Sequence, residues 1–164
     1  MNNEIVNYNP TRATLLQMRC DPVTFPRLNT IPKETAIEQM SLIVQQAFLY
    51  RGQEMNPDNI HFIAAAVIEE ILTERQFGSD NLSMAEIQVI VKKAVLSGEM
   101  YGVSVATIYK AVTDYAKGEG HLHQVEADNQ AREQRKEELK KSIIAPMLQA
   151  YAGEFIRNTK NTKQ

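Results

Sequence analysis

The chain has very little of what a disulfide framework, a cysteine-based zinc site or a membrane span requires. Its 164 residues include one cysteine, Cys20, which can neither close an intramolecular disulfide nor supply the cysteine pairs of structural zinc sites. The longest apolar run, residues 62–68, falls far short of the ~20 residues that a membrane-spanning helix needs. The first residues carry no basic head and no long apolar stretch, so they do not resemble a secretory signal. We therefore expect a cytoplasmic protein without a membrane partner.

An excess of positive charge and the signals of β-strands are also lacking. Lys and Arg number 18 against 20 Asp and Glu, so a strongly basic nucleic-acid binder is excluded, although a local basic face is not. Alternating runs of β-branched residues bounded by turn dipeptides are missing. Hydrophobic residues make up 43% and charged residues 23%, as in a soluble globular domain. These features together predict an all-α protein.

Apolar residues recur at helical spacing over residues 33–118 and predict a compact core domain of four helices. Each helix has its own start and stop signals, because prolines and small polar residues suit a first turn and glycine suits an end. The third helix opens with a capping box, in which a serine and a glutamate bond reciprocally to free N–H groups. The signals are, in order, Pro32 and Gly52, Asn56 and Gly78, Ser83 with Glu86 and Gly98, and Ser104 and Gly118-Glu119-Gly120.

The segments on either side of this core have a different character. Residues 1–32 hold four of the six prolines and predict an extended arm with one turn at residues 11–18, packed on its own domain or reaching a partner. Residues 121–156 predict a long charged helix and then a kinked amphipathic one, with the kink or a new helix at Pro146. Residues 157–164 form a polar tail, which we expect to be disordered.

The residue types that catalysis or metal binding would need occur without the required spacing. His61 borders an apolar stripe, and His121 and His123 do not share one face of a helix, so no metal site is predicted. Neither a phosphate-binding glycine loop nor the dinucleotide fingerprint is present. Cys20 has no base close to it in sequence, and the adjacent acids Glu69 and Glu70 are predicted to lie on the solvated surface. We expect no cofactor and no enzymatic activity.

Residues 101–112 resemble the turn and recognition helix of helix-turn-helix domains such as those of resolvases. In such a domain Val103 and Ile108 would be buried, and the outward side chains would face the major groove while Tyr109 touches phosphate. The connection before Ser104 is longer than usual, and acids balance bases from Glu86 to Glu119, so a capped bundle helix is the competing interpretation. The candidate DNA contacts are Ser104, Val105, Thr107, Tyr109 and Lys110, with Lys92 and Lys93 on the preceding helix.

A second set of motifs lies within roughly residues 40–120. The motifs are, in order, Leu82-Ser83-Met84-Ala85-Glu86-Ile87, Gly98-Glu99-Met100-Tyr101-Gly102, Thr107-Ile108-Tyr109-Lys110 and Tyr115. Their order resembles that of small all-helical replication proteins of phages and mobile elements, some of which act as replisome organisers or helicase loaders. The resemblance implies an adaptor that acts without an ATPase module of its own.

The resemblance implies that the C-terminal helices contact a partner, which would be a replicative helicase or an initiator. The apolar face of the amphipathic residues 143–155 must be covered by the core, by a second copy of the chain or by that partner. We therefore predict a non-enzymatic replication adaptor, with a helix-turn-helix regulator as the alternative and a virion or scaffold component left open. The candidate partner contacts are Arg132, Arg135, Lys136, Ile143, Ile144, Met147 and Tyr151.

Overall fold

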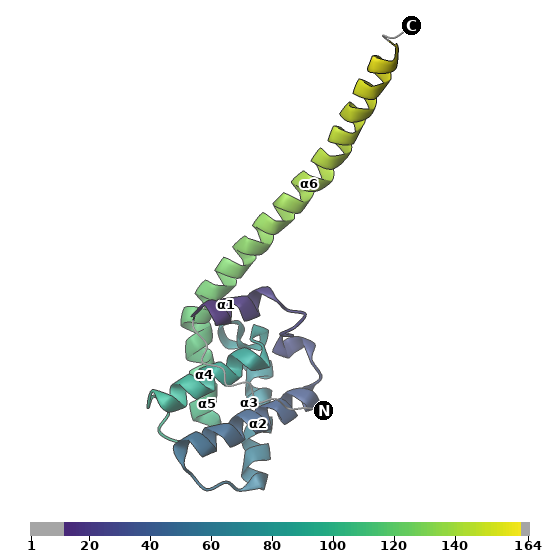
Figure 1. Ribbon diagram of the computed structural model, residues 1–164. Coiled ribbons are helices and arrows are strands. Elements are labelled where there is room, and N and C mark those ends of the chain that lie inside the picture. Colours follow the sequence, from purple (N-terminus) through teal and green to yellow (C-terminus); the bar gives the residue numbers. More distant parts are fainter. Residues whose placement is uncertain (1–11, 162–164) are drawn as a thin grey trace. The chain divides into compact units, whose positions relative to one another are not determined.

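The computed structural model describes residues 12–161, and it describes side chains for residues 14–143, 146 and 147. Across the described residues the chain forms six α-helices joined by short 3₁₀ and π segments, with one isolated β-bridge between Arg27 and Ser83 and no strand (Figure 1). The prediction of an all-α protein is therefore confirmed.

The helices of the predicted core begin at the expected signals. In α3 the Asn56 side chain accepts the Asp58 N–H at 3.0 Å, and α4 and α5 each open with a complete capping box from Ser83 and Ser104. Gly52 follows α2 with φ 62°, a left-handed conformation that glycine adopts without strain. The bounds are Lys33–Arg51 for α2, Pro57–Glu74 for α3, Met84–Leu96 for α4 and Val105–Tyr115 for α5.

The main core lies among these four helices, which Figure 1 shows crowded together. Helix α2 packs along α3 and α4, and α5 packs against the same two helices. Each fully buried aliphatic side chain contributes about 1.5–3 kcal/mol by leaving water. The completely buried members include Met40, Val44, Val67, Ile68, Ile71, Ile87, Ile108 and Val112.

The described part of the N-terminal stretch, residues 12–32, belongs to the first compact unit of the chain, which extends to Ala127. Helix α1 (Arg12–Cys20) is nine residues long where the sequence predicted one turn, and its Leu15 and Met18 pack against Val89 of α4. Leu28, in the 3₁₀ segment η1 (Leu28–Thr30), is buried in the main core. The predicted extended conformation is wrong for Arg12–Cys20, which is helical, whereas the apolar side chains pack on their own domain, which was one of the two predicted alternatives.

The glycines after α5 do not end the helical path. A π-turn, η3 (Ala116–Gly120), joins α5 to α6 (His121–Asn161). A Cβ on Gly120 would lie 3.0 Å from both the ring and the carbonyl oxygen of Tyr115, so glycine here permits close packing. The predicted helix end at residues 118–120 is therefore wrong, and so is the domain end at 118, since His123 and Ala127 are still buried.

Helix α6 runs through both compact units, residues up to Ala127 belonging to the first and Asp128–Gln164 to the second. It continues through Pro146, so of the two predicted alternatives, a kink or a new helix, the new helix is excluded. Part of the predicted disordered tail, up to Asn161, lies within α6, and residues 162–164 lie outside the described residues. The backbone N–H that proline lacks removes one hydrogen bond of the helix without ending it.

Candidate functional site

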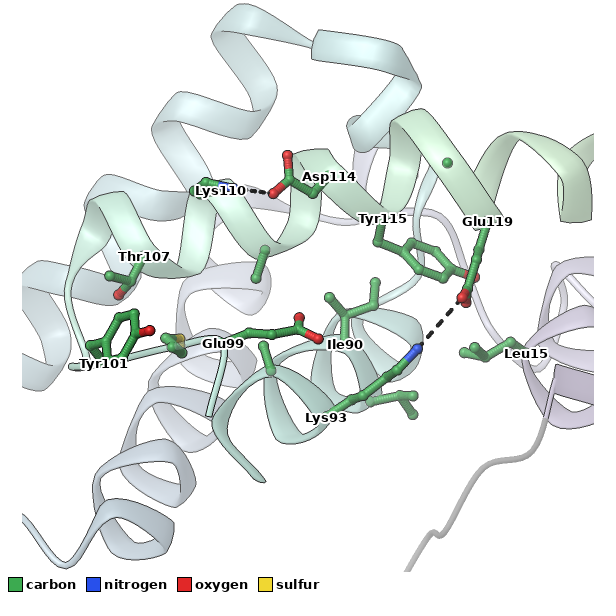
Figure 2. A pocket seen from close by; sticks show the side chains of 15 residues that line it. Leu15, Ile90, Lys93, Glu99, Tyr101, Thr107, Lys110, Asp114, Tyr115 and Glu119 are labelled. Atoms are coloured by element: carbon green, nitrogen blue, oxygen red, sulfur yellow. Dashed lines mark hydrogen bonds and ion pairs between the residues drawn. The ribbon is translucent and has the colours of Figure 1, made fainter. Parts of the chain in front are cut away.

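A groove of about 610 Å³ runs between α4 and α5 in the first compact unit. Leu15 lies at one end of this α4–α5 groove and Tyr101 at the other, with Thr107 and Lys110 on its α5 wall (Figure 2). The volume lies within the range of ligand-binding sites in proteins. Its apolar lining residues are Leu15, Val89, Ile90, Ala94, Met100 and Ala111.

Charged side chains edge the groove, and most are already paired. Lys93 lies 3.5 Å from Glu119, and Lys110 forms an i,i+4 ion pair with Asp114 (Figure 2). Glu99, which follows Gly98 in the connection to α5, makes no ion pair with any residue that the structure describes. The groove therefore carries a small excess of negative charge.

The polar residues predicted to contact DNA at the start of α5 are occupied by the helix cap. The Ser104 side chain accepts the Thr107 N–H at 3.2 Å, and the Ser104 N–H donates to Thr107 Oγ1 at 3.0 Å. The Thr107 hydroxyl also donates to the Gly102 carbonyl at 2.7 Å. Val105 is half-buried against the core. The three-residue spacing of Ser104 and Thr107 is therefore that of the capping box of α5.

Tyr109 points its hydroxyl into the protein. The hydroxyl oxygen is buried and has no hydrogen-bond partner among the described residues. This burial and the carboxylates of Glu74 and Glu70 raise the pKa of Tyr109. The predicted phosphate contact of Tyr109 is therefore not supported by its position.

The predicted basic contacts do not gather on one face. The Lys92 ammonium lies 5.7 Å from the ring centre of Tyr50 on α2, a cation–π arrangement outside the groove that Lys93 lines. Lys93 and Lys110 line the groove, where each has a carboxylate partner. Since DNA affinity depends on cations that neutralise phosphates, this arrangement offers little to a duplex.

A buried ionic cluster at the start of α4 was not predicted. Glu86 is fully buried and accepts from Arg19 Nε at 2.6 Å and from Arg27 Nη1 at 3.3 Å. Its other contacts are the N–H and hydroxyl of Ser83, at 2.8 and 2.9 Å. Arg19 also donates to the Gln124 side chain of α6 at 2.7 Å. The cluster links α1, α4 and the first turns of α6. Because Glu86 is fully buried, we assign the cluster a role in stability rather than in binding.

Tyr115 and His123 form a second polar contact inside the first unit. The Tyr115 hydroxyl lies 2.9 Å from His123 Nδ1, and His123 is 1% exposed. Burial is the main cause of the raised pKa of Tyr115, and the nearby Glu86 carboxylate raises it further, so the phenol keeps its proton. His123 is thereby positioned within the fold.

The remaining candidates for chemistry lie apart from one another. His61 and His121 are exposed on α3 and α6, whereas His123 is buried. In the part of the chain that the structure describes, no three metal-ligating side chains come together. Partial desolvation raises the pKa of the exposed Cys20 thiol, which lowers the thiolate fraction that a nucleophile needs.

The second compact unit presents an exposed apolar row on α6, which we name the α6 stripe: Leu139, Ile143 and Met147. These side chains are 63%, 53% and 55% exposed. Residues four apart lie on one helix face, so the three form a continuous strip. Sequence reasoning predicted Ile143 and Met147 as partner contacts but missed Leu139. The side chains of Ile144 and Tyr151 lie outside the described set, while Arg132, Arg135 and Lys136 are exposed.

No family model matches this chain, and no curated protein or solved structure is significantly similar to it. Among the helices described, none has the length and apolar character needed to cross a membrane.

Proposed function

We propose that this chain is a non-enzymatic adaptor in the DNA replication of a phage or mobile element, of the replisome-organiser or helicase-loader kind, and that it acts through protein contacts. The resemblance of residues 40–120 to such proteins supports the replication setting. The α6 stripe supports the mode of action, because it is a surface that a partner can cover.

The α6 stripe is the observation that carries this proposal. Folded domains rarely leave aligned large apolar side chains in water unless another surface covers them. Two cations of the same helix, Arg132 and Arg135, lie outside every ion pair formed among the described residues, whereas Lys136 pairs with Glu133 at 2.6 Å. The segment therefore offers an apolar anchor together with unpaired positive charge. A partner surface with an apolar patch beside negative charge would complement it.

The partner that fits this proposal is the replicative hexameric helicase of the source organism, or its initiator. The test immobilises the full-length chain and measures capture of the purified helicase. The double variant Leu139→Glu/Ile143→Glu should reduce capture at least about 30-fold, since two buried anchors cost about 1–2 kcal/mol each or more.

The matched control is Phe62→Glu, which places the same charge at a 68% exposed apolar position on α3 in the first compact unit. This variant should capture helicase like the unchanged protein. Equal capture by the α6 double variant, or no capture by the unchanged protein, would contradict the proposal.

The helix-turn-helix regulator remains the second candidate, because α4, the connection and the capped α5 follow one another in the required order. It predicts duplex binding with a steep salt dependence, reduced by Lys110→Ala and by Lys92→Ala/Lys93→Ala. Absence of duplex binding at low salt would eliminate it.

A further inference from the structure

We propose that the α4–α5 groove binds an amphipathic helix of a partner protein, whose apolar row fills the groove and whose Lys or Arg side chain pairs with Glu99. This site lies in the first compact unit and does not depend on the α6 stripe. It goes beyond the proposed function, since an adaptor with two separate surfaces can hold two proteins at once.

The length of the groove suits a helical ligand. Its lining on the side of α5 and η3 runs from Thr107 to Glu119, which at ~1.5 Å per residue corresponds to about 18 Å, or roughly three helical turns. A ligand helix of this length presents anchors at i, i+4 and i+7. Both walls are helices whose backbone groups are already bonded, so an extended peptide finds no strand edge to extend.

The floor of the groove suits apolar anchors. Ile90, Ala94 and Met100 belong to the hydrophobic core and line the groove from below. Ala111 is half-buried on the α5 wall, and its small side chain leaves the middle of the groove open. Leucine-sized side chains placed here would be removed from water on association, which favours binding.

The charges of the groove specify the polar part of the ligand. Lys93 and Lys110 are opposed by Glu119 and Asp114, so Glu99 is the carboxylate that a ligand can neutralise. Figure 2 shows the Glu99 side chain extending between the two helices. A cation on the ligand complements this carboxylate, whereas a phosphate backbone would be repelled by it.

Tyr101 marks one end of the groove as a contact point. Its side chain is 86% exposed, and the Arg51 guanidinium donates to its carbonyl oxygen at 2.8 Å, which holds the connection in place. Tyrosine is one of the residue types enriched among the side chains that contribute most to binding at protein interfaces.

The test uses the full-length chain and two fluorescein-labelled helical peptides of about 15 residues, each with leucines at i, i+4 and i+7. One peptide carries a lysine beside the leucine row and the other a glutamate at that position. Fluorescence anisotropy should show that the lysine peptide binds about fivefold more tightly, the upper range for an exposed ion pair. Glu99→Lys should reverse this preference, and Ala111→Glu should abolish binding of both peptides.

The Leu139→Glu/Ile143→Glu variant is the matched control, because it disables the α6 stripe and should bind the peptides unchanged. Far-UV circular dichroism checks that each variant is folded. No saturable binding of the lysine peptide, or equal binding of both peptides, would overturn the proposal. Displacement of the peptide by duplex DNA would also overturn it, as would a dimer in light scattering that Ala111→Glu dissociates, since the groove would then hold DNA or a second copy.

Discussion

Charged residues are plentiful both at the start of α4 and in the second compact unit, yet they do different work in the two regions. Glu86 pairs with Arg19 across 67 positions of sequence and both side chains are buried. In α6 the pairs Glu133–Lys136 and Glu137–Lys140 are three residues apart and exposed. Buried long-range pairs fix tertiary structure, whereas exposed local pairs support one helix and leave its surface available to a partner.

The difference follows from the cost of removing charge from water. A buried carboxylate loses several kcal/mol of hydration, which only a full set of donors offsets. Glu86 receives two arginines, a hydroxyl and a backbone N–H, so its desolvation is compensated only in the folded arrangement. An exposed pair neither loses hydration nor gains much attraction in high dielectric.

The largest expected effect comes from removing the buried charge. Glu86→Gln should lower the free energy of unfolding by about 3–5 kcal/mol, because Arg19 would remain buried without its counter-ion. Urea denaturation followed by circular dichroism measures this loss.

The matched control for this variant is Glu133→Gln, the same change at an exposed carboxylate. It should alter the free energy of unfolding by less than about 0.5 kcal/mol. Equal losses in the two variants would remove the distinction between the regions.

A smaller effect is expected from removing the hydrogen bond between Tyr115 and His123 than from removing the buried charge of Glu86. Tyr115→Phe should cost about 1–3 kcal/mol, because the buried His123 Nδ1 loses its 2.9 Å hydrogen bond to the Tyr115 hydroxyl. Folding raises the pKa of Tyr115 above 10.0, so its contribution is complete below pH 10 and is lost as pH rises above it. Unfolding at a series of alkaline pH values should show a steeper decline for the unchanged protein than for Tyr115→Phe, while Tyr101→Phe should follow the unchanged protein.

Local signals in the sequence predicted the starts of helices well. Asn56, Ser83 and Ser104 cap the helices that they were expected to cap, because a cap depends on residues within one turn. The stop predicted at Gly120 was wrong, since what requires glycine there is the ring of Tyr115, and no local rule distinguishes close packing from termination. The sequence allowed the N-terminal stretch to pack on its own domain, but it did not predict the nine-residue helix α1, whose Leu15 and Met18 pack against Val89 of α4.

The candidate sites show the same difference between local signals, which the sequence reveals, and contacts between residues distant in sequence, which it does not. Glu86 was predicted as part of a capping box, but Arg19 and Arg27 lie 67 and 59 positions from it, and no spacing rule connects them. Ser104 and Thr107 were interpreted as DNA contacts although their spacing is that of a cap. The exposed side chains Ile143 and Met147 followed from the amphipathic pattern of the segment, which is a local property.

The two serine caps provide a finer comparison. Ser104→Ala should lower the free energy of unfolding by about 1 kcal/mol, the usual cost of losing an N-cap acceptor. Ser83→Ala should cost more, because the Ser83 hydroxyl is buried and also donates to Glu86 at 2.9 Å. Chemical denaturation of both variants measures the order, and a larger loss for Ser104→Ala would show that the buried cluster does not depend on its hydroxyl donor.

The smallest effect is expected in the second unit. Glu137→Gln should weaken α6 by only about 0.2–0.5 kcal/mol, because its pair with Lys140 at 3.0 Å is exposed to water. Thermal melts followed by far-UV circular dichroism, with the double variant Glu137→Gln/Lys140→Met to isolate the pair, should show the difference vanishing near 1 M salt, where screening shortens the Debye length to about 3 Å. A loss that persisted in salt would mean that Glu137 is desolvated by another surface. The exposed charges of α6 would then already be part of an interface, and the contrast with Glu86 would be one of degree.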